Sequence, residues 1–195
     1  MLSSIHPLGE RARHNRWAIT AASFTAGAAL AGSTIGLALG ALGGAALGGL
    51  AEITLLAITG GIALLAGALD WAGIKPPGPK RQVNEHWIGS FRGWVYGGAF
   101  GLELGSGFVT YIVTWGVYAT YAAAMLTVSP MTGALVGLTF GLGRSISVLA
   151  AGFVDRPSRL TSFNRGLAKA GPFARRAASA TFALGGALVL TVALI

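Results

Sequence analysis

The chain has 195 residues, of which 53% are hydrophobic and only 10% are charged, and its mean hydropathy is +0.67. An ordinary soluble domain of this size does not have that composition, so we expect a membrane-embedded protein. Cysteine is absent, which excludes disulfides, thiolate metal sites and dithiol relays, and the net charge of +8 is carried by short segments between apolar stretches.

Five apolar stretches, each near or above the roughly 20 residues that a helix needs to cross a bilayer, predict an all-α, polytopic transmembrane bundle in a single domain, 1–195. They cover residues 17–43, 47–72, 93–127, 131–153 and 173–195. The first follows basic residues, as a signal peptide does, but it is too long for one and is expected to be retained. The third is too long for one untilted helix. We expect it to tilt, to break near Gly105-Ser106-Gly107, or to form a hairpin that makes a sixth crossing.

Lysine and arginine gather in three segments, 1–16, 73–92 and 154–172, whereas the turns near Gly44 and Ser129 carry neither. With five crossings all three segments lie on one side, which the positive-inside rule makes cytoplasmic. The sequence therefore predicts a multi-pass protein of a bacterial inner membrane, with a cytoplasmic N-terminus and basic segments beside anionic lipid headgroups. Nucleic-acid binding is not expected, because the basic residues stand in short loops without a DNA- or RNA-binding motif.

Glycine recurs at every fourth position in three of the apolar stretches. Residues four apart share a helix face, so each series forms a flat glycine stripe on which a second helix backbone can approach closely. The stripes are Gly32, Gly36, Gly40, Gly44 and Gly48; Gly93, Gly97, Gly101 and Gly105; and Gly133, Gly137 and Gly141. They predict close helix packing, and they also offer a surface for a partner helix or a second copy of the chain.

A basic lead that contains tryptophan precedes a glycine-rich helix twice, at residues 10–17 and 83–94, and a fainter copy precedes the last stretch. This pattern indicates an internal repeat, and repeats in membrane proteins often place a binding site at their interface. The alternative is that arginine and tryptophan only anchor helix ends at the membrane surface.

Two ionisable residues fall deep within predicted helices. Glu103 lies about 15 Å into the third stretch at 1.5 Å per residue, and Arg144 lies at a comparable depth in the fourth. A lone charge there costs at least ~2.5 to 3.5 kcal/mol, so the two are expected either to form a structural ion pair or to line a solute or proton path. Glu52 is expected near the non-cytoplasmic face, hydrated or on that path, and Asp70 at the cytoplasmic interface.

Ser106, Thr110 and Thr114 follow Glu103 at spacings of three and four, so one helix would carry them all on a single polar face. These residues are candidates for solute binding. Alternatively, the hydroxyl groups only bond neighbouring helices.

Signals for cofactors and catalysis are missing from the sequence. His6, His14 and His86 stand apart without carboxylates at ligand spacing, so no metal site is expected. Neither a nucleotide-binding glycine motif nor a Ser-His-Asp arrangement can be recognised, so we expect no cofactor and no enzyme activity.

Residues 97–107, followed by Ala122-Ala123-Ala124 and by residues 139–144, resemble one half of the CcdA/DsbD-type (LysE/TauE-like) membrane proteins. That family has a Gly-Phe-Gly-rich start, a Pro-Cys break in mid-helix and a later glycine-rich helix, in two inverted halves. This chain has Ser106-Gly107, or Ser33-Thr34, at the place of the Pro-Cys. The resemblance implies the scaffold, or the cavity of a small-solute exporter, without relayed disulfide reduction.

These patterns favour passage of a small solute or ion through a midplane site formed by Glu103, Arg144, Ser106, Thr110 and Thr114. The alternative is a non-catalytic accessory or assembly subunit of a membrane complex, whose glycine stripes bind partner helices.

Overall fold

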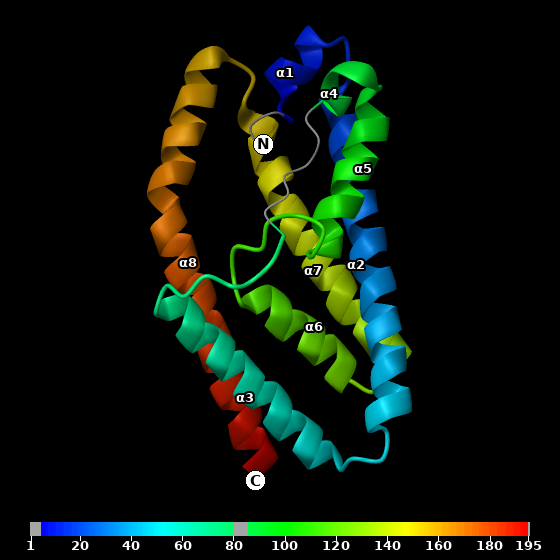
Figure 1. Cartoon of the computed structure of the whole chain (residues 1–195). Helices are drawn as coiled ribbons and strands as arrows, with labels where there is room; N and C mark the ends of the chain where they lie inside the picture. Colours follow the sequence, from blue (N-terminus) through cyan, green and yellow to red (C-terminus); the bar gives the residue numbers. More distant parts are fainter. Residues whose placement is uncertain (1–4, 80–85, 195) are drawn as a thin grey trace.

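The structure is a computed structural model and describes residues 5–79 and 86–194 (Figure 1). Within these ranges every regular element is a helix, which confirms the expected helical class. Four spans are long and apolar enough to cross a membrane. They are α2 (Trp17–Leu47), α3 (Glu52–Trp71), α7 (Pro130–Ala150) with the 3-10 turn η2 (Ala151–Phe153), and α8 (Pro157–Leu194).

The predicted third crossing consists of two shorter helices, α5 (Gly93–Ser106) and α6 (Gly116–Leu126). Of the three arrangements expected for this stretch, the structure therefore has the break after Gly105. Two short helices, α1 (Pro7–Ala12) and α4 (Trp87–Ser90), lie just before α2 and α5.

Helix α8 begins sixteen residues earlier than predicted, because the basic segment 154–172 is mostly helical rather than a loop. Pro157 stands at the first helical position, where its missing N–H costs nothing. With 38 residues, α8 is about 57 Å long at 1.5 Å per residue. Nearly all residues of its basic half, 157–178, are exposed.

Helix α2 packs between α5 and α7, and the glycine stripes line both contacts. A Cβ atom at Gly101 would collide with the carbonyl of Phe24, and one at Gly137 would collide with the carbonyl of Gly32. The stripes are thus filled by helices of the same chain. The expectation that they bind a partner helix or a second copy is wrong for these contacts.

The direction of each helix follows from the glycine contacts. On α5, Gly97, Gly101 and Gly105 meet Thr20, Phe24 and Ala28 in the same order, so α5 runs parallel to α2. On α7 the order is reversed, because Gly133 meets Gly36 and Gly137 meets Gly32. Helix α7 is therefore antiparallel to α2.

Helices α3 and α8 form a second antiparallel pair on the other side of the molecule (Figure 1). Here a Cβ atom at Gly60 would lie 2.8 Å from the carbonyl oxygen of Gly186, and one at Gly67 would lie 2.8 Å from that of Ser179. The short helix α6 contacts α2, α7, α3 and α8, and so connects the two groups.

Candidate functional site

Two helices end part-way along the length of the molecule (Figure 1). Helix α5 stops at Ser106, followed by Gly107 with a φ of 74°, and α3 stops at Trp71, followed by Gly73 with a φ of 75°. Glycine adopts this left-handed conformation without steric cost, which is why it commonly ends helices. Residues 107–115 and the proline-rich segment 73–79 then meet at mid-height of the molecule (Figure 1).

Asp70 joins these two breaks. Its side chain is buried, with 4% of the residue exposed, and its Oδ1 accepts a hydrogen bond of 2.9 Å from the backbone N–H of Trp115. Its Oδ2 accepts a hydrogen bond from the hydroxyl of Thr114, whose Oγ1 in turn accepts from the N–H of Gly116 at 3.0 Å. A carboxylate in this position satisfies the free N–H groups at the start of α6 and favours the helix dipole.

The expectation that Asp70 lies at the cytoplasmic interface of the membrane stays a prediction, and the structure adds that its side chain is buried against the start of α6. The residue is the last but one of α3, and the segment that follows the helix has no regular secondary structure. A position near the end of a hydrophobic stretch therefore does not imply that the side chain is exposed.

Three aromatic side chains hold the exposed carbonyl groups of the breaks. The indole Nε1 of Trp115 donates to the carbonyl of Ile74 at 2.9 Å, and the hydroxyl of Tyr118 donates to the carbonyl of Pro77 at 2.5 Å. The hydroxyl of Tyr121 donates to the carbonyl of Ser106. Backbone carbonyls that no longer bond within a helix need such partners, most of all where water is scarce.

The predicted polar face is divided by the helix break. Glu103 and Ser106 lie on α5, where the hydroxyl of Ser106 donates to the carbonyl of Glu103 at 2.7 Å. Thr110 and Thr114 lie beyond the end of α5, so no single helix carries all four residues. Thr114 belongs to the Asp70 contact, and the buried hydroxyl of Thr110 has no hydrogen-bond partner among the described residues.

The expected ion pair between Glu103 and Arg144 is not formed in the described part of the chain. Glu103 is two residues from both Gly101 and Gly105, so it lies about 200° around α5 from the stripe that packs on α2. Arg144 lies beside the stripe of α7, three residues after Gly141. The two side chains therefore occupy differently directed faces, although their depths along the helices are similar.

Arg144 is half-buried and lies against an aromatic ring instead of a carboxylate. Its Cζ atom is 5.4 Å from the centre of the Phe140 ring, a cation–π distance. The Phe140 ring in turn packs on Tyr121, with their centres 6.0 Å apart. Arg144 thus stands next to the break between α5 and α6.

A second buried charge, Glu10, lies in a segment expected to be a simple basic lead. Glu10 is 0% exposed, and its Oε1 accepts a hydrogen bond from the guanidinium of Arg13 at 2.6 Å and another from the hydroxyl of Tyr96. Its Oε2 accepts from the hydroxyl of Thr20 at 2.9 Å. These bonds join α1, α2 and α5, and sequence reasoning missed them because a carboxylate among arginines looks solvated.

Further contacts at the same end hold the two repeated leads together. Asn15, in the first lead, accepts a hydrogen bond of 3.3 Å from the N–H of Gly93, in the second. The Nδ1 atom of His6 accepts from the N–H of Gly9 at 3.1 Å and caps α1. Burial, and next to it the charge of Arg13, lower the pKa of His6, which keeps the imidazole neutral and able to accept at neutral pH.

Within residues 5–79 and 86–194, no three His, Asp or Glu side chains come together in a way that could hold a metal ion. The polar groups at the breaks instead bond one another and the backbone. The arrangement is that of an all-helical protein with membrane-length helices and two interlocked helix breaks.

The chain is similar to proteins named methylamine utilization protein MauF. It is 35% identical to that of Paracoccus versutus over 152 residues, which are 75% of this chain and 55% of the relative. It is 32% identical to that of Paracoccus denitrificans over 132 residues, 68% of this chain and 47% of the relative. It is 31% identical to that of Methylophilus methylotrophus over 154 residues, 75% of this chain and 53% of the relative.

The chain therefore spans about half the length of the curated relatives it matches. No profile of a known protein family matches it, and no solved structure does. The resemblance to CcdA/DsbD-type (LysE/TauE-like) proteins is wrong, because the relatives carry the MauF name.

Proposed function

We propose that this chain is a multi-pass membrane protein that serves as a non-catalytic accessory component of a methylamine-utilisation system. The similarity to MauF over three quarters of the chain is the observation that carries the proposal. The names of the relatives do not support solute transport. The ion pair between Glu103 and Arg144, which the sequence analysis placed in a solute path, is not formed in the described chain.

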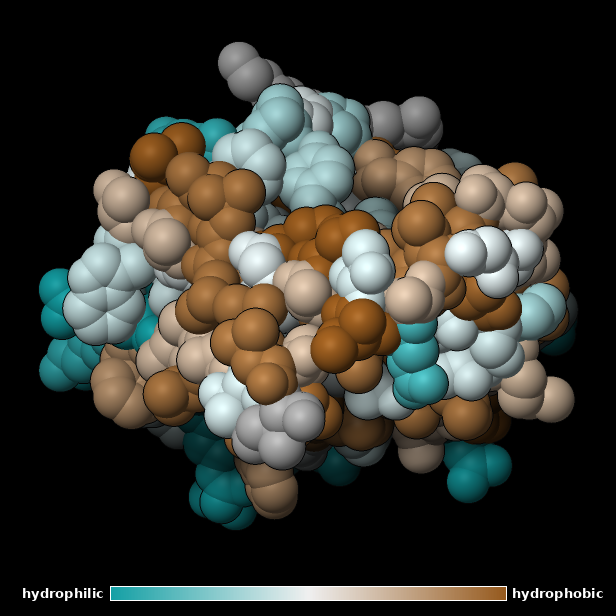
Figure 2. Space-filling model, turned by 90° about the horizontal axis from the view of Figure 1, so that it is seen from below, coloured by the Kyte–Doolittle hydropathy of each residue, from teal (hydrophilic) through white to brown (hydrophobic). Residues whose placement is uncertain are grey.

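The surface of the helices supports a membrane location. Large apolar side chains point outward along the long helices, among them Leu30, Leu65 and Leu188, each more than half exposed. Figure 2 shows hydrophobic side chains over much of one end of the molecule as well. In water, contiguous apolar surface of this extent is rare on a folded monomer, whereas acyl chains solvate it without cost.

The arrangement of the basic segments supports five crossings. The chain runs one way in α2, back in α3, forward in α5 and α6, back in α7 and forward in α8 (Figure 1). Helices α1 and α4 and the start of α8 then lie at one end, together with most of the described basic residues. The positive-inside rule places that end in the cytoplasm.

The non-catalytic role is supported by what the polar residues do. Asp70 caps α6, Glu10 binds three side chains, and the aromatic hydroxyls and indole hold backbone carbonyls. These groups are engaged in holding the breaks and the helix ends together. The face that such a protein offers to partners is then its outer, apolar surface.

The test is deletion of the gene in a strain that grows on methylamine, with growth on succinate as the control. Growth on methylamine and the amount of active methylamine-oxidising enzyme should both fall, while growth on succinate and the initial uptake of labelled methylamine stay unchanged. Loss of initial uptake with a normal level of active enzyme would contradict the accessory role and favour transport.

A further inference from the structure

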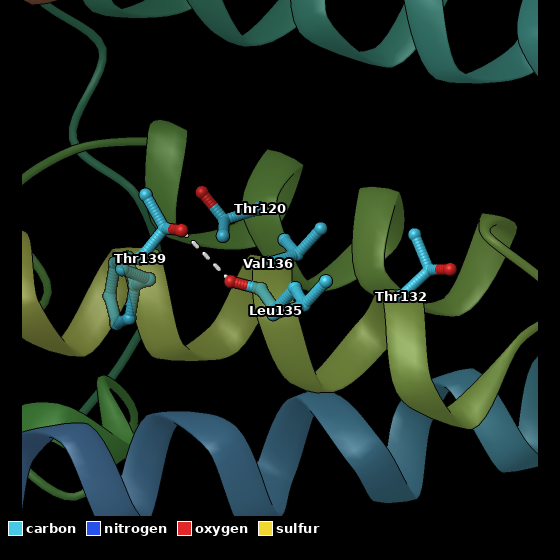
Figure 3. A pocket seen from close by; sticks show the side chains of 6 residues that line it. Thr120, Thr132, Leu135, Val136 and Thr139 are labelled. Atoms are coloured by element: carbon cyan, nitrogen blue, oxygen red, sulfur yellow. Dashed lines mark hydrogen bonds between the residues drawn. The ribbon is translucent and has the colours of Figure 1, made fainter.

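An open groove lies between α6 and α7. Its volume is about 420 Å³, and Figure 3 shows Thr120 of α6 beside Thr139 and close to Val136 of α7. Its lining consists of Thr120, Thr132, Leu135, Val136, Thr139 and Phe140. The hydroxyls of Thr120 and Thr139 donate to helix carbonyls at 2.8 and 2.9 Å, so they are already engaged and the groove is mainly apolar.

Arg144 stands at one end of this groove. Thr132, Val136, Phe140 and Arg144 are four residues apart in turn, so they form one row along α7. Phe140 connects the groove to Arg144, since its ring lines the groove and also lies under the guanidinium of Arg144. An apolar row therefore leads directly to a cation.

The guanidinium of Arg144 has no carboxylate partner and donates no hydrogen bond to the rest of the described chain. Arginine offers five N–H donors and stays charged, so the ring of Phe140 alone leaves it under-satisfied. The residue is nine positions from Phe153 and fourteen from Pro130, about 13 and 21 Å from the two ends of the span.

At this depth the surroundings limit what can pair with Arg144. The hydrocarbon core is about 30 Å thick, so the phosphate of an ordinary lipid stays roughly 15 Å from the midplane. A charge so deep is usually paired with another side chain or faces a wet cavity. The adjacent groove is apolar, which matches a protein helix better than a hydrated ion.

We infer that this groove is the docking site for a membrane-spanning helix of a partner protein that carries one acidic residue at the depth of Arg144. The apolar side chains of that helix fill the space between α6 and α7. Its carboxylate accepts paired hydrogen bonds from the guanidinium, which makes the contact specific in depth and in sequence. The inference rests on the proposed accessory function and names the chemistry of the partner.

The test uses a defined probe, a synthetic Leu/Ala helix with one glutamate at its midpoint, reconstituted with the full-length protein in nanodiscs of phosphatidylcholine. Binding is measured by energy transfer between labels on the two components. The glutamate peptide should bind at least tenfold more tightly than the same peptide with glutamine. A peptide with the glutamate moved two helical turns toward one end should lose this preference.

Variants of Arg144 separate the charge from the fold. Arg144→Gln should bind both peptides equally, Arg144→Lys should retain part of the preference, and Arg144→Glu should instead prefer a peptide with a midpoint lysine. Leu142→Gln, at an exposed neighbouring position, serves as the matched control and should keep the preference. The thermal unfolding of each variant in detergent shows which of them are folded.

Equal binding of the glutamate and glutamine peptides to the folded wild-type protein would overturn the inference. So would removal of the glutamate preference by millimolar acetate or chloride, which would assign Arg144 to a free anion. Neither result changes the outcome expected in the growth experiment on methylamine. Failure of the docking site can therefore be distinguished from failure of the accessory role.

Discussion

Asp70 shows how one side chain can stabilise two irregular segments at once. It stands at the end of α3 and bonds the backbone and a hydroxyl at the start of α6, although 44 and 45 residues separate the partners in sequence. A helix N-terminus without a cap leaves several N–H groups unbonded. Here the cap comes from another helix, so the two breaks depend on each other.

Replacing Asp70 with alanine is expected to lower the stability of the protein by ~1 to 3 kcal/mol, because the N–H of Trp115 and the hydroxyl of Thr114 lose their buried acceptor. Asp70→Asn retains one acceptor oxygen and should cost less. Thermal unfolding in detergent measures both effects. Glu52→Ala, at the exposed start of the same helix, is the control and should change little. Equal melting temperatures for Asp70→Ala and Glu52→Ala would show that the cap is not needed.

The candidate residues illustrate what sequence spacing can and cannot predict. It correctly placed Glu103 and Arg144 within helices, because position in an apolar stretch fixes depth approximately. It could not predict their directions, which depend on how each helix is rotated about its axis by its neighbours. Asp70 and Glu10 were missed as buried groups for the same reason, since their acceptors and donors come from elements far away in sequence.

At the scale of elements, glycine spacing was the most informative signal. Period four predicted close helix approach, and the structure places both stripes of α5 and α7 against α2. The pattern did not tell an internal contact from an external one, because a flat face fits any backbone. The break after Gly105 could be anticipated from helix length, whereas the early start of α8 could not, because its first half is too polar to stand out as a span.

The glycine contact between α2 and α7 predicts opposite effects for two alanine substitutions in one helix. Gly137→Ala should destabilise the protein by ~1 to 3 kcal/mol or more, because its Cβ collides with the carbonyl of Gly32, which cannot move without its helix. Gly143→Ala meets nothing within 4 Å and should be neutral or stabilising by up to ~1 kcal/mol through helix propensity. Melting temperatures measured side by side test this, and a stability of Gly137→Ala equal to that of Gly143→Ala would contradict the packing role of the stripe.

At the scale of the whole molecule, two groups of helices are joined mainly through α6 and the interlocked breaks. Helix α2 with α5 and α7 forms one group, and α3 with α8 forms the other. Gly116 of α6 lies so close to the ring of Phe182 of α8 that a Cβ atom would collide with it. The contact between the two groups is therefore close but covers only a short helix. The helix breaks after α3 and α5 lie at this contact and contribute to holding the two groups together.

The five alternating runs of the chain make a definite prediction about sidedness. Arg16 and Arg159 lie at the end that the positive-inside rule assigns to the cytoplasm, and Gly49, in the turn between α2 and α3, lies at the opposite end. Since the chain has no cysteine, a single cysteine at each position can be labelled without a background. The variants are expressed in a Gram-negative host, and only the outer membrane of the cells is made permeable. A maleimide that cannot cross the inner membrane should then label Gly49→Cys and spare Arg16→Cys and Arg159→Cys. All three should react after detergent is added, which serves as the control for reactivity. Labelling of Arg16→Cys but not of Arg159→Cys, or the reverse, would mean an odd number of crossings between them and would reject the five-crossing arrangement.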